Sequence, residues 1–408
     1  MKKVLITKVT DGITRREGLL SMLGGAMALA GCGGGGGGGL ASVTSGGTGS
    51  FSSGPITGFG SIILNSNGVR IDDSTATITD DDGNNLRGQL KLGMLATVQG
   101  SAVTGTTATA TSIVISGELQ GRIQGTPNTT NRTFVVLGQT VQVTGSTIFD
   151  VSLANGFSSL ASDTIVEVHG VLDPAANALA ATFIERKASP QLFKIQGVVS
   201  NHDATARKFN IGATRIDYSA ATDVRITPVN GALVRVRLTA VLPPLAAPAE
   251  WLATRIRPSE NVNQDRDEAE IEGSITAFTS AAQFSVNGVA VTTSSSTRFD
   301  DGTAGLAVGA RVEVRGRISG GVLIADRVKI EDANDVNNLE FELHGAVSAV
   351  TATTFEVRGI RVNYTSATPL RNGSLTNLVN GALVEVRGTA LNPVNASTSI
   401  NATRISFK

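Results

Sequence analysis

The chain has 408 residues, too long for one ordinary domain and suited to several. It is rich in Gly (47 residues) and poor in aromatic residues (4%) and charged residues (17%), a mixture that favours short strands and tight turns over long amphipathic helices. The formal net charge is zero, and the first 32 residues carry more bases than acids, so the remainder is slightly acidic and has no general attraction for nucleic acid. The single cysteine excludes a disulfide within the chain and a metal site built on several cysteines.

The first 32 residues predict an export signal that is not part of the fold. Residues 14–20 (TRREGLL) resemble the twin-arginine signal, but Gly18 departs from the bulky residue usual there, so the general secretory route stays open. The following apolar stretch is too short to span a bilayer and ends in LAGC, residues 29–32, which resembles the lipobox of bacterial lipoproteins. The resemblance implies that Cys32 is lipidated and anchors the chain to the outer membrane, facing the periplasm or the cell surface. Residues 33–54, rich in Gly, Ser and Thr, predict a flexible linker.

Self-comparison of the remaining chain indicates five tandem repeats. A segment of the form Ala-Thr-x-Ile recurs at nearly equal intervals, at residues 110–113, 181–184, 253–256, 325–328 and 402–405. A second landmark, Val-Glu-Val-x-Gly, begins at residues 166, 312 and 384, with degenerate versions at 96 and 234. These landmarks place the repeats at residues 55–117, 118–188, 190–259, 268–332 and 340–408.

Each repeat contains five or six short strands in which apolar and polar residues alternate, with one brief helical turn. This element list is typical of a small OB-like barrel, so we expect an all-β chain of five tandem small β-barrel repeats of about 70 residues. The alternation puts Phe, Val and Ile inside and Glu, Arg, Gln and Thr on an outer, solvated face. A unit of this size buries only about 60% of its surface, so we also expect neighbouring repeats to pack on one another.

The opening of the first repeat, GFGSIILNSNGVRI at residues 58–71, is similar to a repeat of bacterial envelope proteins, the domain of unknown function family 5666. The two recurring landmarks also resemble that family, and the resemblance covers nearly all of residues 55–408. It implies a β-barrel unit and a surface-exposed lipoprotein. It implies no reaction, cofactor or catalytic residue.

The three histidines do not predict a catalytic or metal site. His169 and His344 occupy strand positions that hold Arg, Gln or Glu in the other repeats, and His202 lies in a loop, so we expect all three on the surface. The chain has no other pattern typical of a metal or cofactor site that we would favour.

The glutamates of the Val-Glu-Val landmark are equivalent residues, Glu167, Glu313 and Glu385. The pair of carboxylates in a glycan-cleaving enzyme lies roughly 5–10 Å apart, an arrangement that single outward glutamates reach only if repeats pack face to face. We therefore predict solvated strand positions and no catalytic residues. The acidic run at residues 80–85 (DDDGNN) predicts a hairpin turn.

Two features are candidates for ligand or partner contact. Tyr218 and Tyr364 hold the same position in the third and fifth repeats and are either half-buried packing residues or a platform for a sugar. Pro243 and Pro244 lie in a long apolar loop that we interpret as the best candidate for a partner contact. Trp251 aligns with apolar residues of the other repeats and predicts a core position.

The sequence as a whole favours a non-enzymatic exported lipoprotein that serves as a structural or binding element of the envelope, with an envelope protein or polysaccharide as a possible partner. One alternative is a module that binds an oligosaccharide or polymer on its barrel faces. A second alternative is a glycan-active enzyme with a carboxylate site between repeats.

Overall fold

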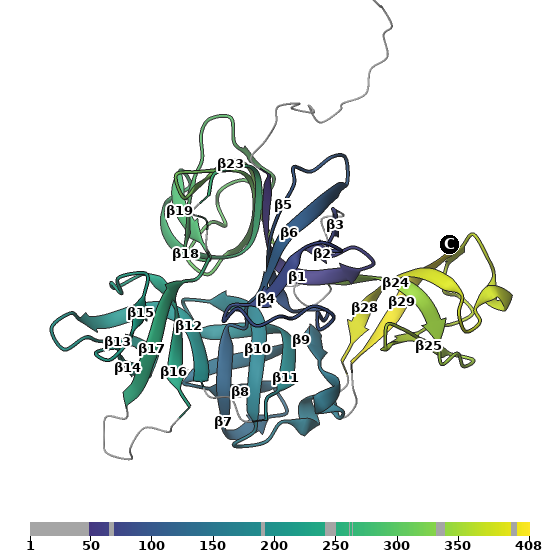
Figure 1. Ribbon diagram of the computed structural model, residues 1–408, viewed down its shortest axis with the longest axis horizontal. Helices are drawn as coiled ribbons and strands as arrows, with labels where there is room; N and C mark the ends of the chain where they lie inside the picture. Colours follow the sequence, from purple (N-terminus) through teal and green to yellow (C-terminus); the bar gives the residue numbers. More distant parts are fainter. Residues whose placement is uncertain are drawn as a thin grey trace, which may run out of the picture. The chain divides into compact units, whose positions relative to one another are not determined.

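The computed structural model describes residues 49–64, 69–188, 192–240, 250–260, 262, 264–331, 339–392 and 398–408. The chain divides into two units, residues 1–45 and 46–408, and the described residues all belong to the second (Figure 1). The described ranges contain strands and three short 3-10 helices. None of those helices has the length and apolar character that crossing a membrane requires. The predicted signal sequence, Cys32, Pro243 and Pro244 lie outside the described residues.

The five repeats contain the following elements. Repeat 1 has β1 (Ser50–Phe59), β2 (Ile63–Leu64), β3 (Arg70–Asp72), β4 (Thr77–Asp80), β5 (Leu95–Gly100) and β6 (Thr107–Ile115). Repeat 2 has β7 (Leu119–Asn128), β8 (Thr133–Val136), β9 (Gln139–Phe149), η1 (Val151–Leu153), η2 (Gly156–Ser159), β10 (Ile165–Asp173) and β11 (Ala178–Arg186). Repeat 3 has β12 (Leu192–Asp203), β13 (Lys208–Ile211), β14 (Thr214–Asp217), β15 (Asp223–Val224), β16 (Leu233–Thr239) and β17 (Glu250–Pro258). Repeat 4 has β18 (Arg266–Ser280), β19 (Gln283–Val286), β20 (Val289–Thr292), β21 (Arg298–Phe299), β22 (Arg311–Ser319) and β23 (Val322–Ile330). Repeat 5 has β24 (Glu340–Ser348), β25 (Thr354–Val357), β26 (Ile360–Asn363), β27 (Leu370–Arg371), η3 (Leu375–Asn377), β28 (Leu383–Leu391) and β29 (Ser399–Phe407).

Repeats 2 to 5 share one order of elements: a long opening strand, a hairpin, a crossing segment and two long strands. The hairpin of repeat 4 turns at Asn287 and Gly288, whose φ angles are both positive (49° and 80°). A two-residue turn with this backbone matches the twist of the strands it joins, and Asn-Gly adopts it most readily. The element order predicted from the recurring landmarks is therefore present in the structure.

A steric constraint explains why Gly recurs at the last position of the Val-Glu-Val-x-Gly landmark. In repeats 2, 4 and 5 the last two strands shift register directly before this residue (Gly170, Gly316, Gly388). A Cβ added at Gly316 would lie 2.0 Å from the carbonyl oxygen of Ile324, and one added at Gly388 would lie 2.3 Å from that of Asn401. The landmark therefore marks a β-bulge at which the neighbouring strand leaves no room for a side chain.

The strand pairing crosses repeat boundaries. Within repeat 2 it returns to the opening strand, since β7 pairs with β8 and β10, β9 pairs with β8 and β11, and β10 pairs with β11. Between repeats, β7 also pairs with β12, and β1 pairs in parallel with both β18 and β24. The described strands consequently belong to two sheets, one of 18 strands and one of 11.

The prediction of five separate small OB-like barrels is therefore wrong. The sheets form a β-solenoid of stacked coils. The alternation pattern describes each strand's two faces but says nothing about its two edges, and here the opening strands use their edges to pair with strands of other repeats. This pairing satisfies backbone groups that a separate unit would expose. Strand β1 also begins at Ser50, so residues 50–54 belong to the sheet and not to the predicted linker.

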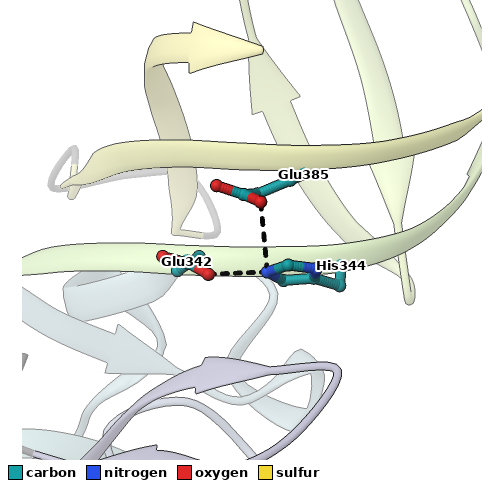
Figure 2. A group of neighbouring side chains, drawn as sticks. All are labelled: Glu342, His344 and Glu385. Atoms are coloured by element: carbon teal, nitrogen blue, oxygen red, sulfur yellow. Dashed lines mark hydrogen bonds and ion pairs between the residues drawn. The ribbon is translucent and has the colours of Figure 1, made fainter. Parts of the chain in front are cut away.

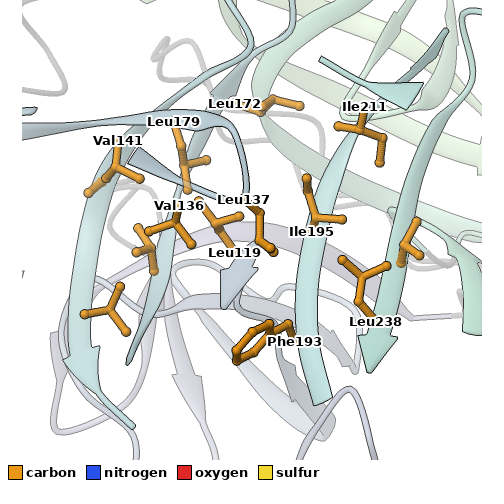
Figure 3. Close-up of a cluster of buried hydrophobic side chains, with 14 of the residues drawn as sticks. Leu119, Val136, Leu137, Val141, Leu172, Leu179, Phe193, Ile195, Ile211 and Leu238 are labelled. Atoms are coloured by element: carbon orange, nitrogen blue, oxygen red, sulfur yellow. The ribbon is translucent and has the colours of Figure 1, made fainter. Parts of the chain in front are cut away.

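The apolar side chains form cores that span repeats. One cluster joins repeats 2 and 3, and Figure 3 shows part of it, with Leu119 and Val136 of repeat 2 and Phe193 and Ile195 of repeat 3. A second cluster joins repeats 1 and 5, and a third fills repeat 4 together with Phe51 of β1. Small repeats thus share apolar interior, as their limited size requires.

Candidate functional site

The charged positions predicted to face solvent are buried. Glu167, Glu313 and Glu385 are only 5%, 8% and 7% exposed. Each lies on the polar side of a long strand, but that side is covered by charged partners, several of which come from another repeat. The prediction that these glutamates are exposed to solvent is therefore wrong. The stacking of repeats that joins the sheets also covers the polar faces of their strands.

In repeat 5, two carboxylates and an imidazole meet (Figure 2). Glu342 and His344 lie two residues apart on β24, and Glu385 on β28 is directly opposite His344. The Nε2 atom of His344 is 2.6 Å from Oε1 of Glu342 and 3.8 Å from Oε2 of Glu385. Two carboxylates and an imidazole are a ligand set that transition metals accept. The three ligand atoms also lie within 4.8 Å of one another, close enough to share one ion.

The surroundings of this cluster do not suit a cation. Arg70, on β3 of repeat 1, bonds to Glu342 and places its Nη1 atom 2.9 Å from Nε2 of His344. Lys408 lies 2.6 Å from Glu385, and Arg387 lies 2.8 Å from Glu342. A metal ion would have to displace Arg70 and then sit among the remaining positive charges. The cluster is better described as an ion-pair network around two buried carboxylates that ties repeat 1 to repeat 5.

The pKa of Glu342 reflects this network. Burial acts to raise it, but the hydrogen bond with His344 and the charges of Arg70 and Arg387 outweigh burial and lower the pKa to about 2. The carboxylate is therefore ionised at neutral pH.

A second network lies between repeats 2 and 3. One oxygen of Glu167 is 2.5 Å from Nζ of Lys194, and the other is 2.7 Å from Nζ of Lys187. Lys187 also lies 2.5 Å from Glu185, so this lysine bridges two carboxylates. They border a pocket of about 260 Å³ whose other side is formed by repeat 1 residues, among them Lys91 and Met94. Glu167 and Glu185 are directly opposite each other on β10 and β11, so this carboxylate pair lies within repeat 2 and not between repeats.

His169 lines the same pocket but is only 1% exposed, so the surface position predicted for it is wrong. Its Nδ1 atom accepts a hydrogen bond from the backbone N–H of Leu95 (3.2 Å), and its ring meets the edge of Phe183 at 5.6 Å. Burial disfavours the charged imidazolium and lowers the pKa of His169 to about 4. His169 is therefore a neutral packing residue that joins repeats 1 and 2.

The acidic run at residues 80–85 does form a turn, closed by a hydrogen bond from the N–H of Gly83 to the carbonyl of Asp80. Its carboxylates, however, dock on repeat 3. Asp81 bonds to Arg237 and lies 3.6 Å from Lys194, while Asp82 lies 2.5 Å from Arg255. The side chains of Asp81 and Arg237 are 9% and 3% exposed.

The sequence held a signal for this contact. Where repeats 2, 4 and 5 have Glu in the Val-Glu-Val landmark, repeat 3 has Arg235. The reversed charge faces acidic partners, since Arg235 lies 3.5 Å from Glu118 and 3.9 Å from Asp81.

The tyrosines proposed as contact residues lie in the core. Tyr218 and Tyr364 are 7% and 9% exposed, and each ring packs 5.6 Å from a phenylalanine. The hydroxyl of Tyr364 donates to the carbonyl of Thr351 (2.7 Å), and that of Tyr218 lies 2.8 Å from His202. A sugar platform needs an exposed aromatic face, so this burial argues against the ligand interpretation. Trp251, predicted for the core, is only partly buried and packs against the edge of the cluster of repeats 2 and 3, with its ring centroid 5.7 Å from that of Phe193.

These observations define an all-β protein of tandem repeats joined by shared sheets, shared cores and buried ion pairs. Residues 120–185, 272–329 and 344–406 match the family described as domain of unknown function (DUF5666). The family model thus matches three segments of the chain, consistent with a repeat-built protein of this family. The matched segments lie in repeats 2, 4 and 5, a narrower coverage than the expected one, and they leave out the two repeats with degenerate landmarks. A comparison with the curated proteins found no match.

Proposed function

We propose that this chain is an exported, lipid-anchored protein of the bacterial envelope, attached to the outer membrane through Cys32, and that it serves as a non-enzymatic structural or binding element. The LAGC segment at the end of a short apolar stretch supports the anchor. The Gly-rich stretch that follows supports a tether between the anchor and the folded repeats.

One observation carries the structural role: in the described repeats, the carboxylates of the Val-Glu-Val landmark are buried and paired with cations of the same chain. These paired carboxylates hold neighbouring strands and repeats together. A carboxylate engaged in this way is not available to exchange a proton with a substrate. The alternative of a glycan-active enzyme needs two carboxylates between repeats, but Glu313 is paired with Arg315 and Glu385 with Lys408.

The anchor is tested by expressing the native chain and its Cys32→Ala variant in a Gram-negative host supplied with radiolabelled palmitate. We expect the native chain to be labelled and to sediment with the outer membrane, and the variant to be unlabelled and released. An unlabelled native chain would refute the anchor. Mass spectrometry of what co-purifies with the lipidated chain then distinguishes a binding role from a purely structural one, and we expect an envelope protein or polysaccharide and no nucleic acid.

A further inference from the structure

Repeat 5 carries a hollow of about 490 Å³ on its surface. Its lining consists of Glu340, Pro369, Leu370, Arg371, Arg387, Thr403 and Arg404. Three guanidinium groups thus face one small volume, against one carboxylate at Glu340. Comparison with the other repeats shows what this arrangement lacks.

The arginine of the last strand has a counterpart in repeats 3 and 4, since Arg255, Arg327 and Arg404 share one position in the recurring Ala-Thr-x-Ile segment. In repeat 4, the crossing segment supplies Asp300, whose Oδ2 accepts a hydrogen bond from Nε of Arg327 (2.7 Å). In repeat 3, it supplies Asp223, 3.3 Å from Nε of Arg255. Both repeats therefore neutralise this arginine with an aspartate of their own.

Repeat 5 has no such aspartate. The parallel pairing of the crossing strand with the last strand puts Val328 opposite Phe299 in repeat 4 and Ile405 opposite Leu370 in repeat 5. The residue after Phe299 is Asp300, and the residue after Leu370 is Arg371, so an arginine stands where repeat 4 has the neutralising acid. Arg371 is exposed and has no ion pair among the described residues.

The other two guanidinium groups are held from behind by the ion-pair network. Arg387 lies 2.8 Å from Glu342, and Arg404 lies 3.4 Å from Glu385. Their Nε atoms are buried without a hydrogen-bond partner in the described structure. The network therefore positions two cations at the hollow before any ligand arrives, which lowers the entropy lost on binding.

We propose that this hollow binds an oxyanion of an acidic envelope glycan, which takes the place that Asp300 fills in repeat 4. Planar guanidinium groups pair with carboxylate and phosphate alike, so the anionic group is a uronic acid carboxylate or a phosphate ester. The hydroxyl of Thr403 donates to the carboxylate of Glu340 at 3.3 Å, and this hydrogen-bonded pair borders the hollow, where the hydroxyls of the sugar that carries the anion would lie. The choice of a glycan rests on the proposed envelope location, whereas the anion site rests only on the geometry.

The test is calorimetric titration of the full chain with an oligogalacturonate and, separately, with a neutral galactan oligomer of the same length. We expect the acidic oligomer to bind, the neutral one not to bind, and the affinity to fall as salt rises. The decisive variant is Arg371→Asp, which copies repeat 4 and supplies Arg404 with an internal carboxylate. We expect its affinity to fall at least about tenfold, as the loss of a charge-assisted contact implies, and Arg371→Ala to lose less.

The matched control is Arg361→Asp, which makes the same change of charge at an exposed position of β26 that does not line the hollow. We expect it to bind within twofold of the native chain, and an equal loss in both aspartate variants would overturn the site in favour of general charge attraction. Inorganic phosphate serves as a competitor, and binding of phosphate without binding of the uronate would assign the site to a phosphate-bearing glycan. Absence of binding by both probes would overturn the anion site, and it would leave the palmitate result at Cys32 unaffected.

Discussion

Replacing Asp81 by Asn removes the acidic centre of the contact between repeats 1 and 3. The carboxylate bonds to Arg237 and lies near Lys194 and Arg235, in a site where these side chains are between 3% and 12% exposed. Removing one partner of a buried ion pair leaves the other charge unpaired and costs about 3–5 kcal/mol. Since Asp82 still faces Arg237 at 3.1 Å, we expect the lower end, about 3 kcal/mol of unfolding free energy.

Trp251 provides the assay, because it is the only tryptophan of the chain and lies in β17 of repeat 3. Its fluorescence during urea unfolding reports on the repeat that receives Asp81. We expect a clearly lower midpoint for Asp81→Asn and a midpoint within error of the native one for Asp326→Asn, an exposed aspartate of repeat 4.

The pH dependence of the same transition has a defined sign. The pKa of Asp81 is lowered, because burial, which raises it, is outweighed by Lys194, Arg235 and Arg237. A lowered pKa in the folded state contributes stability that is present above the pKa of the unfolded chain, about 4, and is lost as pH falls through the folded value. The native chain should therefore lose more stability than Asp81→Asn on acidification below about pH 4. Equal urea midpoints for both proteins at pH 7 would refute the reasoning.

Three further predictions follow from the described contacts. Gly388→Ala should lower the unfolding free energy by about 1–3 kcal/mol, because the added Cβ meets the carbonyl of Asn401. Gly359→Ala is the control in the same repeat, since its Cβ enters open space and tests only backbone strain. Equal denaturation temperatures for the native chain and Gly388→Ala would contradict the bulge argument. His169 should titrate near pH 4 in NMR spectra, and because its folded pKa is below its unfolded value of 6.5, it destabilises the fold as pH drops from about 6.5 towards 4; titration near 6.5 would mean that the ring is solvated. Zinc should bind the native chain weakly or not at all and bind Arg70→Gln more tightly, because that variant removes the cation that contacts both Glu342 and His344; calorimetry showing tight binding to the native chain would contradict the ion-pair interpretation.

The order of elements within a repeat was predictable, because it depends on local signals. Turn residues such as Asn287-Gly288, and the Gly that the bulge requires, recur in the sequence whatever their distant surroundings. The pairing of β1 with β18 and β24 was not predictable in this way. A strand's side chains report which face is apolar, but its edges are backbone and carry almost no sequence signal.

The predictions for the polar residues were wrong for a related reason, since their burial depends on contacts between repeats. Glu385 alternates with Val384 and Val386 as a solvated residue would, but Lys408 of its own repeat and Arg70 of repeat 1 both pair with it, and it is buried. The positive charge of Arg235 is complementary to the negative charges of Asp81 and Asp82. The chain has many other acidic residues, however, and the spacing along the sequence does not indicate which of them Arg235 contacts. The pair Asp300 and Arg371 shows the opposite case, since the difference between repeats is visible once their strands are aligned.

The pairing of β1 also fixes the order in which the protein can be completed. Ser50 is among the first described residues to be synthesised, yet its parallel partner is Glu268. Phe59 likewise pairs with Leu343, which is synthesised much later. Contacts between residues so distant in sequence form slowly, because a long loop must close before they stabilise anything. Repeats 2 and 3 share a sheet and a core with each other and can assemble early, while β1 keeps an unpaired edge until repeats 4 and 5 arrive. A chain that stops after repeat 3 would leave that edge open to pairing with other molecules, so the last two repeats act as the protection of the first.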